Sequence, residues 1–185
     1  MTKQSELALA VHDALVEENI PYLLADSFAT MAYGISRSTK DVDFVIELSQ
    51  PGFDNLLRRL EPLFTLDPQQ HLEKLTWTRR YILAAKSTPF KVELFIKDTD
   101  PHHDMQWSRK AWRQNGILGR KIWMPTAEDV IIQKIRRGRP RDRADVLDVM
   151  SVQAETLDWP YIEGWCDQHG TRQLLDELRA GIPPI

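Results

Sequence analysis

Residues 22–48 read YLLADSFATMAYGISRSTKDVDFVIEL, and this stretch contains the pattern that decides the fold. It begins with the short apolar run YLLA, which is typical of a buried strand. Asp26 and Ser27 are of the types that cap helices, and Gly34 is of the type that ends them, which predicts a helix between these positions. After a polar loop, residues 41–48 alternate between polar and apolar side chains, and this alternation predicts a second strand.

The second predicted strand carries two neighbouring carboxylates. Because strand side chains alternate, Asp41 and Asp43 share one face and the apolar side chains share the other. Two adjacent carboxylates repel each other, so that without a cation one of them tends to keep its proton. Mg²⁺ removes this repulsion, and it prefers a few carboxylates together with phosphate oxygens. The pair alone is a weak indication, because two solvated aspartates at the start of an exposed strand give the same pattern.

The composition is that of an ordinary globular protein and fits one domain: 185 residues, 42% hydrophobic and 28% charged. The formal net charge is -3, so any contact with nucleic acid must come from a local patch. Cys166 is the only cysteine, which excludes an internal disulfide and a cysteine-based zinc site. The first residues do not resemble a signal peptide, and no stretch is apolar enough to span a bilayer. We therefore expect a cytoplasmic protein without a membrane partner.

The middle of the chain contains a third candidate carboxylate. In chain order, the patterns predict a helix over residues 5–19, a helix over 51–61, an irregular segment over 62–74, and strands over 77–86 and 90–97. In the last of these strands Glu93 lies on the face opposite the apolar side chains. If this strand neighbours the strand of Asp41 and Asp43, three carboxylates converge. Taken alone, Glu93 is more simply explained as a solvated strand residue.

Residues 98–116 are predicted to form a loop. His102 and His103 lie there, but adjacent histidines lack the spacing of a zinc site, so we interpret them as plain loop residues. Trp107 and Trp112 are able to stack on nucleic-acid bases. Packing under a long loop is the simpler interpretation of both tryptophans.

The last third of the chain is predicted to be a strand or hairpin over residues 117–124 followed by helices. A helix begins at Thr126 with a capping-box pattern and ends at Gly138. Further helices are predicted from Pro140 to about Gln153, and in one or two short pieces between residues 159 and 180. Five arginines surround the junction of the first two helices: Arg136, Arg137, Arg139, Arg141 and Arg143. They predict a solvated basic corner or, as the alternative, a phosphate or RNA contact.

Lys134 projects from the apolar face of the helix that begins at Thr126. A lysine on the buried side of a helix needs an anionic partner. That partner is a substrate phosphate or a neighbouring aspartate, Asp142 or Asp145, and the sequence does not decide between them.

In combination, these segments resemble a minimal nucleotidyltransferase of the DNA polymerase β-like superfamily, close to its AbiEii-type branch. The first motif of that family is an apolar strand, Gly-Gly or Gly-Ser, a helix, a polar loop with Arg-x-Thr, and Asp-x-Asp on a strand. Here it runs from Leu23 to Asp43, with Arg37-Ser38-Thr39 in the loop. Glu93 matches the third carboxylate of the family. The segment PTAEDVIIQKIRRGRPRDRADV, residues 125–146, resembles its helical element.

The resemblance implies an α/β (α+β) fold, with a small mixed sheet flanked by helices and C-terminal helices. It implies a nucleotidyltransferase-like α/β core over residues 1–125, with a helical part over residues 126–185 packed on the same domain. The implied activity is Mg²⁺-dependent or Mn²⁺-dependent transfer of NMP from an NTP, such as ATP, to a hydroxyl. The acceptor is an RNA, tRNA among them, a protein or a small molecule. Some relatives are toxins of toxin–antitoxin pairs, which adds an antitoxin as a partner.

The resemblance also assigns roles to particular residues. Catalysis and metal binding fall to Asp41, Asp43 and Glu93. Nucleotide binding falls to Ser27, Arg37, Thr39, Lys134 and Asp142.

One position departs from the family pattern, because Asp26 replaces the first glycine of the motif. An aspartate that caps the helix beside the phosphates competes for its amides and repels an anion, which predicts weaker triphosphate binding. The alternative function is therefore a catalytically degenerate module that binds a partner protein such as an antitoxin. A haloacid-dehalogenase-type phosphatase also uses Asp-x-Asp, but there the apolar strand precedes the pair, whereas here it follows.

Overall fold

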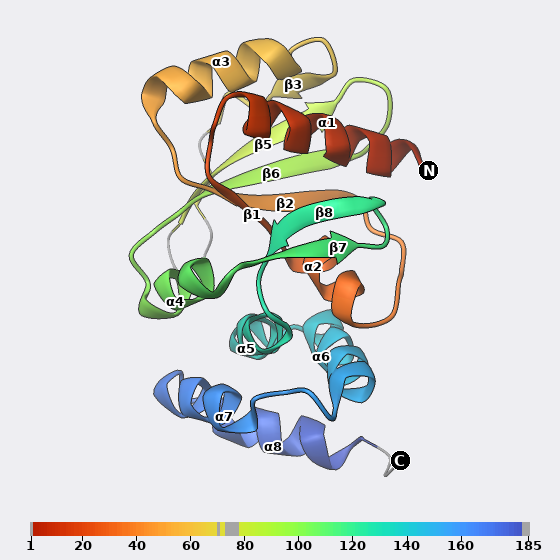
Figure 1. Cartoon of the computed structure of the whole chain (residues 1–185), viewed down its shortest axis with the longest axis vertical. Coiled ribbons are helices and arrows are strands. Elements are labelled where there is room, and N and C mark those ends of the chain that lie inside the picture. The colour runs from red at the N-terminus through yellow and green to blue at the C-terminus, as the bar shows by residue number, and fades with distance from the viewer. Residues whose placement is uncertain (1, 70, 73–77, 183–185) are drawn as a thin grey trace.

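The computed structural model of the chain describes residues 2–69, 71–72 and 78–182; Trp77, where the sequence predicts the start of a strand, lies outside them. An upper part built on a β-sheet lies on a lower part made of helices (Figure 1). No helix among the described residues combines the length and the hydrophobicity that a membrane span requires.

The order of helices and strands is that of a mixed α/β protein, and it confirms the predicted α/β (α+β) class. The elements are α1 (Lys3–Glu17), β1 (Tyr22–Ala25), α2 (Asp26–Tyr33), β2 (Asp41–Ile46), α3 (Gln50–Leu60), β3 (Phe64–Leu66), β4 (His71–Leu72), β5 (Arg79–Ala85), β6 (Lys91–Ile96), α4 (Pro101–Arg109), β7 (Ala111–Asn115), β8 (Arg120–Met124), α5 (Ala127–Arg137), α6 (Pro140–Gln153), α7 (Trp159–Gln168) and α8 (Arg172–Ala180).

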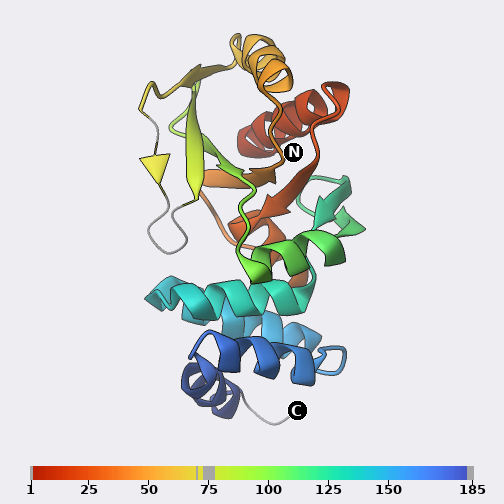
Figure 2. The ribbon, with the colours of Figure 1, turned by 90° about the vertical axis from the view of Figure 1, so that its left-hand side faces the viewer.

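The main sheet has the strand order β1-β2-β6-β5-β3, and β4 pairs with β5. Strands β2 and β6 are parallel, and the other neighbouring strands are antiparallel. Helices α1 and α3 cover one face of this sheet, as Figure 2 shows. The predicted alternation is present in β2, where Val42, Phe44 and Ile46 are fully buried in the core under these helices. The opposite face of the sheet is thereby left to the polar side chains.

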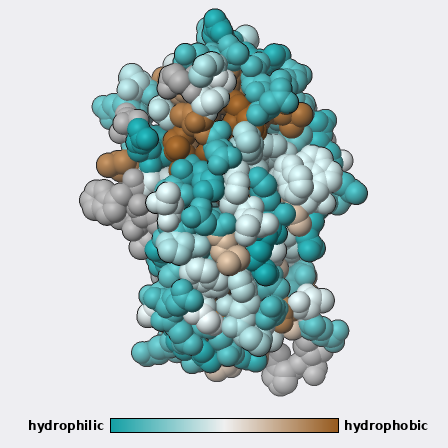
Figure 3. Space-filling model, turned by 60° about the vertical axis from the view of Figure 1, so that its left-hand side comes forward, coloured by the Kyte–Doolittle hydropathy of each residue, from teal (hydrophilic) through white to brown (hydrophobic). Residues whose placement is uncertain are grey.

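The lower part has a core of its own, built from helices α5 to α8. Helix α2 joins the two parts, because Phe28 packs in the core of the sheet and Ala29 and Tyr33 pack in the helical core. On the face seen in Figure 3, hydrophobic residues gather in the upper half, and the helical half is mostly hydrophilic. The predicted division into residues 1–125 and 126–185 stays a prediction.

The boundaries of the C-terminal helices agree with the capping signals. The Thr126 hydroxyl accepts a hydrogen bond from the Asp129 amide and caps α5. Gly138, with a φ of 62°, ends α5 in a left-handed conformation that glycine adopts easily. Helix α6 then runs from Pro140 to Gln153, as predicted, and α7 and α8 are the two short helices.

The sequence prediction is wrong for two segments. Residues 62–74, predicted as irregular, contain the short strands β3 and β4, which exist because they pair with β5. Residues 98–116, predicted as a loop, contain α4 and β7. The Asp100 carboxylate accepts hydrogen bonds from the amides of His102 and His103 and caps α4, and Pro101 follows it.

Trp112, the tryptophan of β7, is also not packed as predicted. Strand β7 pairs with β8 in a separate hairpin, so the hairpin alternative predicted for residues 117–124 is present, but it begins earlier, at Ala111. In this hairpin Trp112 is 45% exposed. A residue under a loop would be covered, whereas Trp112 lies on an open strand face.

Candidate active site

Three carboxylates lie on the face of the sheet that α1 and α3 leave open. In the parallel pairing of β2 with β6, Asp43 is opposite Glu93 and Asp41 is opposite Lys91. The two predicted strands are therefore neighbours, and Asp41, Asp43 and Glu93 share one face because cross-strand partners point to the same side. The Thr39 hydroxyl donates a hydrogen bond to Asp41 Oδ1 over 2.7 Å and fixes that side chain.

Asp43 is buried, with only 6% of its surface accessible. Burial raises its pKa well above the usual value, and the negative charges of Asp26, Glu93 and Asp41 raise it further. Asp43 is therefore not the solvated strand residue that the alternative interpretation of the pair requires. A cation that approaches this carboxylate would favour its ionised form.

Glu93 has a cation of its own. Arg80 Nη1 lies 2.6 Å from Glu93 Oε2. Burial raises the pKa of Glu93, the Arg80 guanidinium opposes that rise, and Asp41 adds to it. Arg80 balances one of the three carboxylates, and the other two have no such partner among the ion pairs of the described residues.

Asp26 does not cap α2, contrary to the sequence interpretation. The N-cap is Ala25, which makes no side-chain hydrogen bond, and Asp26 is the first helical residue with a φ of 43°. This left-handed conformation favours glycine, which explains physically why a glycine fits the position. The Asp26 carboxylate instead pairs with Lys134 Nζ and with Arg137 Nη1, the latter at 2.6 Å.

Lys134 is the centre of a second group of carboxylates. Its side chain is 3% exposed, and Nζ contacts Asp26, Asp145 Oδ2 at 2.7 Å and Asp142 Oδ1 at 3.3 Å. Both predicted aspartates are thus partners of Lys134. Asp26 is a third partner, which sequence reasoning missed because it lies 108 residues away along the chain.

Arginines complete this group. Arg37 forms a two-point contact with Asp145, with both N–O distances 2.9 Å, and Arg139 Nε lies 2.6 Å from Asp142. Burial alone would raise the pKa of Asp26, but Arg137 and Lys134 outweigh it and hold that pKa far below the usual value. The carboxylates around Lys134 are therefore ionised and balanced by the protein itself.

The oxygens of Asp26, Asp142 and Asp145 all lie within 4.8 Å of one another, a spacing that a metal ion could use. We assign this space to Lys134, because its ammonium group already contacts all three carboxylates. A divalent ion would have to displace a buried lysine, which would leave an uncompensated charge. At Asp43, by contrast, the neighbouring negative charges favour an added cation.

Two pockets meet at the carboxylates of the sheet. The basic pocket, about 350 Å³, is lined by Asp26, Ser27, Arg37, Asp41, Lys134, Arg139, Pro140 and Arg141. The apolar pocket, about 120 Å³, lies between the open sheet face and helices α4 and α5; among its lining residues are Asp43, Val45, Phe95, Trp107 and Val130. Asp41 lines the first pocket and Asp43 lines the second. Two adjacent carboxylates thus separate a pocket suited to a polyanion from a pocket suited to a less polar molecule.

The predicted nucleotide-binding residues lie at or behind the basic pocket. Ser27 lines it, and its hydroxyl accepts a hydrogen bond from Arg37 Nη2 over 3.3 Å. Thr39 reaches it only through Asp41. Asp142 is fully buried behind Lys134 and Arg139, so it contacts these cations and not the pocket.

No family model matches the chain, and no curated protein matches it in sequence. Solved structures do match. ANT(2")-Ia in complex with adenylyl-2"-tobramycin has a TM-score of 0.64 at 13% identity, over 93% of this chain and 99% of that chain. The lincosamide antibiotic adenylyltransferase LnuA, lincomycin-bound, has 0.55 at 12% identity, over 82% and 98%. An antigenic nucleotidyltransferase-like protein from Paracoccidioides brasiliensis has 0.55 at 18%, over 100% and 96%. The chain therefore has the nucleotidyltransferase fold.

Proposed function

We propose that this protein transfers a nucleoside monophosphate from an NTP to a hydroxyl group, with Mg²⁺ or Mn²⁺. One observation supports this most: Asp41 and Asp43 stand at the junction of a basic and an apolar pocket, with Glu93 beside them. Nucleotidyl transfer needs two neighbouring pockets of this kind, because a polyanionic donor and an acceptor must meet at one phosphorus atom.

The triphosphate of the donor binds in the basic pocket. Arg37, Arg139 and Arg141 line it together with the Ser27 hydroxyl, so that it offers positive charge and a hydrogen-bond donor. Lys134 adds its ammonium group from the floor of the pocket. Asp142 acts indirectly, because it holds Lys134 and Arg139 in place.

The donor set at the sheet fits a hard divalent cation. Asp41, Asp43 and Glu93 offer only carboxylate oxygens, and Asp43 is a buried acid whose negative neighbours outnumber its positive ones. A bound Mg²⁺ supplies charge neutralisation for these carboxylates and for the phosphate oxygens. Thr39 holds Asp41 for this purpose, and the Arg80 guanidinium favours the ionised form of Glu93.

The chemical step is an in-line displacement at the α-phosphorus. Glu93 accepts the proton of the acceptor hydroxyl, the acceptor oxygen forms a bond to phosphorus, and the bond to pyrophosphate breaks. Most of the rate comes from positioning and charge neutralisation. The acceptor enters through the apolar pocket, which Asp43 lines.

The family resemblance extends the proposal to biology. We assign the protein to the AbiEii-type branch, as a cytoplasmic toxin of a toxin–antitoxin pair whose acceptor is an RNA such as tRNA. The similarity to solved structures supports the fold on which this assignment depends. The identity of the acceptor has to be determined by experiment.

The alternative function is a degenerate module that binds a partner protein, such as an antitoxin. One observation favours it: the Asp26 carboxylate already pairs with Lys134 and Arg137, which a phosphate would otherwise use. Both functions share the fold and differ in whether NTP binds.

The test is a labelling assay. Purified protein is incubated with each α-³²P-labelled NTP, MgCl₂ and total RNA, and the products are separated by electrophoresis. We expect label on RNA from the parent, none from Asp43→Asn, and parent-like label from Glu155→Gln, an exposed carboxylate in the turn after α6. No transfer and no NTP binding by the folded parent would contradict the proposal and leave the partner-binding alternative.

A further inference from the structure

The β7–β8 hairpin exposes two tryptophans on one face. Trp112 and Trp123 are cross-strand partners, 45% and 37% exposed, with ring centroids 5.3 Å apart and planes tilted by 56°. Their neighbours on this face are Gln114 and Lys121, which also pair across the strands and are exposed. The opposite face of the hairpin packs on the core through Ile122 and other buried residues. We name the four exposed residues the tryptophan face.

The segment that contains the hairpin carries only positive charges. Residues 105–127 contain five lysines or arginines and no acidic residue, in a chain whose net charge is -3. Arg120 pairs with Asp13 and Arg109 approaches Glu128 and Asp129. Among the ion pairs of the described residues, Lys110, Arg113 and Lys121 take part in none. Unpaired cations beside exposed aromatic rings leave a charge that an external anion can balance.

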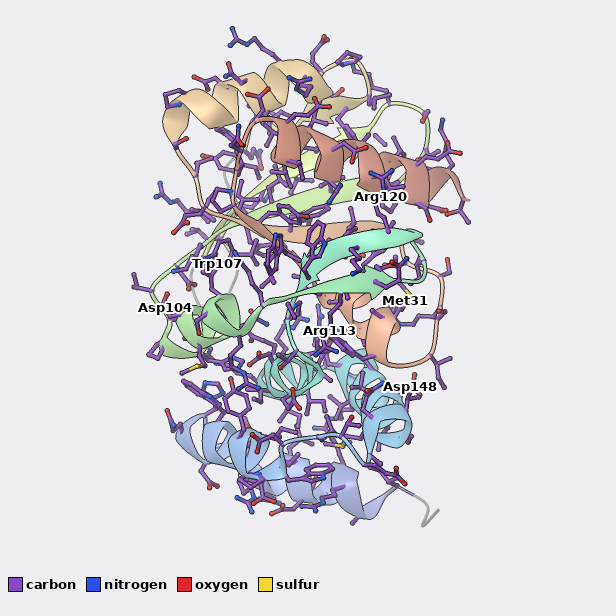
Figure 4. All side chains as sticks on the ribbon, viewed as in Figure 1. Met31, Asp104, Trp107, Arg113, Arg120 and Asp148 are labelled. Carbon is purple, nitrogen blue, oxygen red and sulfur yellow. The ribbon has the colours of Figure 1, made fainter. Side chains whose placement is uncertain are left out.

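A row of cations and rings leads from the tryptophan face to the apolar pocket. Lys110 Nζ lies 5.8 Å from the ring centroid of Trp123 and 3.5 Å from that of Trp107. Lys97 Nζ lies 6.0 Å from the ring centroid of Trp107. Trp107 and Lys97 both line the pocket that also contains Asp43. Figure 4 shows Trp107 beside α4, on the side of this helix toward the sheet.

From this juxtaposition we propose that the tryptophan face, continued by Lys110 and Trp107, binds single-stranded nucleic acid and guides its end into the apolar pocket. Bases stack on the tryptophans and phosphates lie on Lys121 and Lys110, the combination that single-strand binding surfaces use. A duplex does not fit, because its bases are already stacked on each other. The guidance of the end rests on the proposed function, whereas the binding does not.

A second copy of this chain is the main competing occupant of two exposed tryptophans. The charge argues against it. A self-complementary contact would bring like-charged segments together, with Lys121 of each copy near the other, and like charges at an interface weaken association. A phosphate backbone has the opposite charge.

The test is fluorescence anisotropy with 12-nucleotide RNA and DNA strands of mixed sequence, without NTP or metal. We expect the parent to bind a single strand, and the double variant Trp112→Ala/Trp123→Ala to bind at least about tenfold more weakly. Lys121→Gln should lower the dependence of log K on log salt by about one phosphate contact. Arg120→Gln is the matched control: it removes the same charge one residue away, but from the side chain that pairs with Asp13, and should bind as the parent.

Further arms separate the alternatives. The same strands annealed into duplexes should bind at least about tenfold more weakly than the single strands. Because binding is measured on the parent without NTP or metal, a failure of catalysis does not hide the binding. The proposal is overturned if the folded parent binds no single strand, or if the double tryptophan variant and the parent bind equally. Sedimentation that shows a parent dimer lost in this variant, without nucleic-acid binding, would assign the face to self-association.

Discussion

Two groups of three carboxylates lie side by side in this protein, and they differ in what balances their charge. The sheet group is Asp41, Asp43 and Glu93, and the lysine group is Asp26, Asp142 and Asp145. Four cations serve the lysine group: Lys134, Arg37, Arg137 and Arg139. In the sheet group, the ion pairs of the described residues contain only the pair of Arg80 with Glu93.

The difference appears in the pKa values. Burial raises the pKa of carboxylates in both groups, but the cations reverse its effect at Asp26, Asp142 and Asp145 and lower their pKa values. At Asp43 the neighbours add to burial, and the pKa rises. Proximity of acids therefore does not by itself identify a metal site. The group that the protein leaves unbalanced is the one that needs an external cation.

The largest expected effect breaks the lysine group. Lys134→Met keeps most of the apolar stem but leaves the buried Asp142 and Asp145 and the partly buried Asp26 without their shared cation. We expect a loss of about 3–5 kcal/mol in the free energy of unfolding, the range for a broken buried pair. Urea denaturation at pH 7.5 measures it, with Lys3→Met, an exposed surface lysine, as the control. A loss below about 1 kcal/mol would show that the carboxylates of the lysine group do not depend on Lys134 for their stability.

The next effect compares one carboxylate from each group. Without divalent metal, Asp145→Asn should destabilise by about 2 kcal/mol or more, because it removes a partner of both Lys134 and Arg37. Asp43→Asn should leave stability unchanged or raise it by about 1 kcal/mol, because it removes a buried and repelled charge. Thermal and urea unfolding in EDTA compare the two variants. Equal losses of unfolding free energy in both variants would mean that the two groups do not differ in how their charges are balanced.

Asp26 links the groups, and its removal should tighten nucleotide binding. Asp26→Gly frees Lys134 and Arg137 and suits the φ of 43°. We expect about tenfold higher affinity for an NTP at saturating Mg²⁺, near 1.4 kcal/mol. Asp26→Asn is the control for charge, since asparagine tolerates this backbone conformation and is neutral. Titration calorimetry that finds equal or weaker binding by both variants would make Asp26 a neutral or necessary part of the site.

The smallest effect is a dependence of stability on pH in the helical part. Burial, followed by the charge of Arg136, lowers the pKa of His169 to about 4. The folded state therefore favours the neutral ring, and stability is lost as the pH falls from about 6.5 toward 4. The half-buried ring is partly screened, so we expect about 1 kcal/mol or less. The difference in unfolding free energy between the parent and His169→Gln should change over this range, and a constant difference would contradict the assignment.

Much of the fold follows from local signals. The alternation around Val42 and Phe44 predicts β2, and Thr126, Gly138 and Pro140 predict where the helices begin and end. Strands β3 and β4 escape prediction because they are two or three residues long and owe their conformation to β5. Helix α4 has a start signal in Asp100-Pro101 but no long apolar stripe behind it.

The candidate site follows less completely from the sequence. The spacing of Asp41 and Asp43 and the alternation around Glu93 predict the sheet group, since both depend on strand geometry alone. The role of Asp26 does not follow, because its partners Lys134 and Arg137 lie more than 100 residues away. The tryptophan face also depends on cross-strand pairing that the irregular pattern of β7 conceals. Local periodicity predicts faces, and only the tertiary structure shows which faces meet.

The central claim is that the sheet group, and not the lysine group, takes a divalent cation together with a nucleotide. Titration of Mg²⁺ into the protein with a non-hydrolysable NTP analogue tests it directly, with Mn²⁺ detected by electron paramagnetic resonance as a second readout. We predict that the parent and Glu155→Gln bind the metal alike, and that Asp41→Asn and Asp43→Asn each bind it at least about tenfold more weakly. Equal binding by the parent and Asp43→Asn, both folded, would contradict the account.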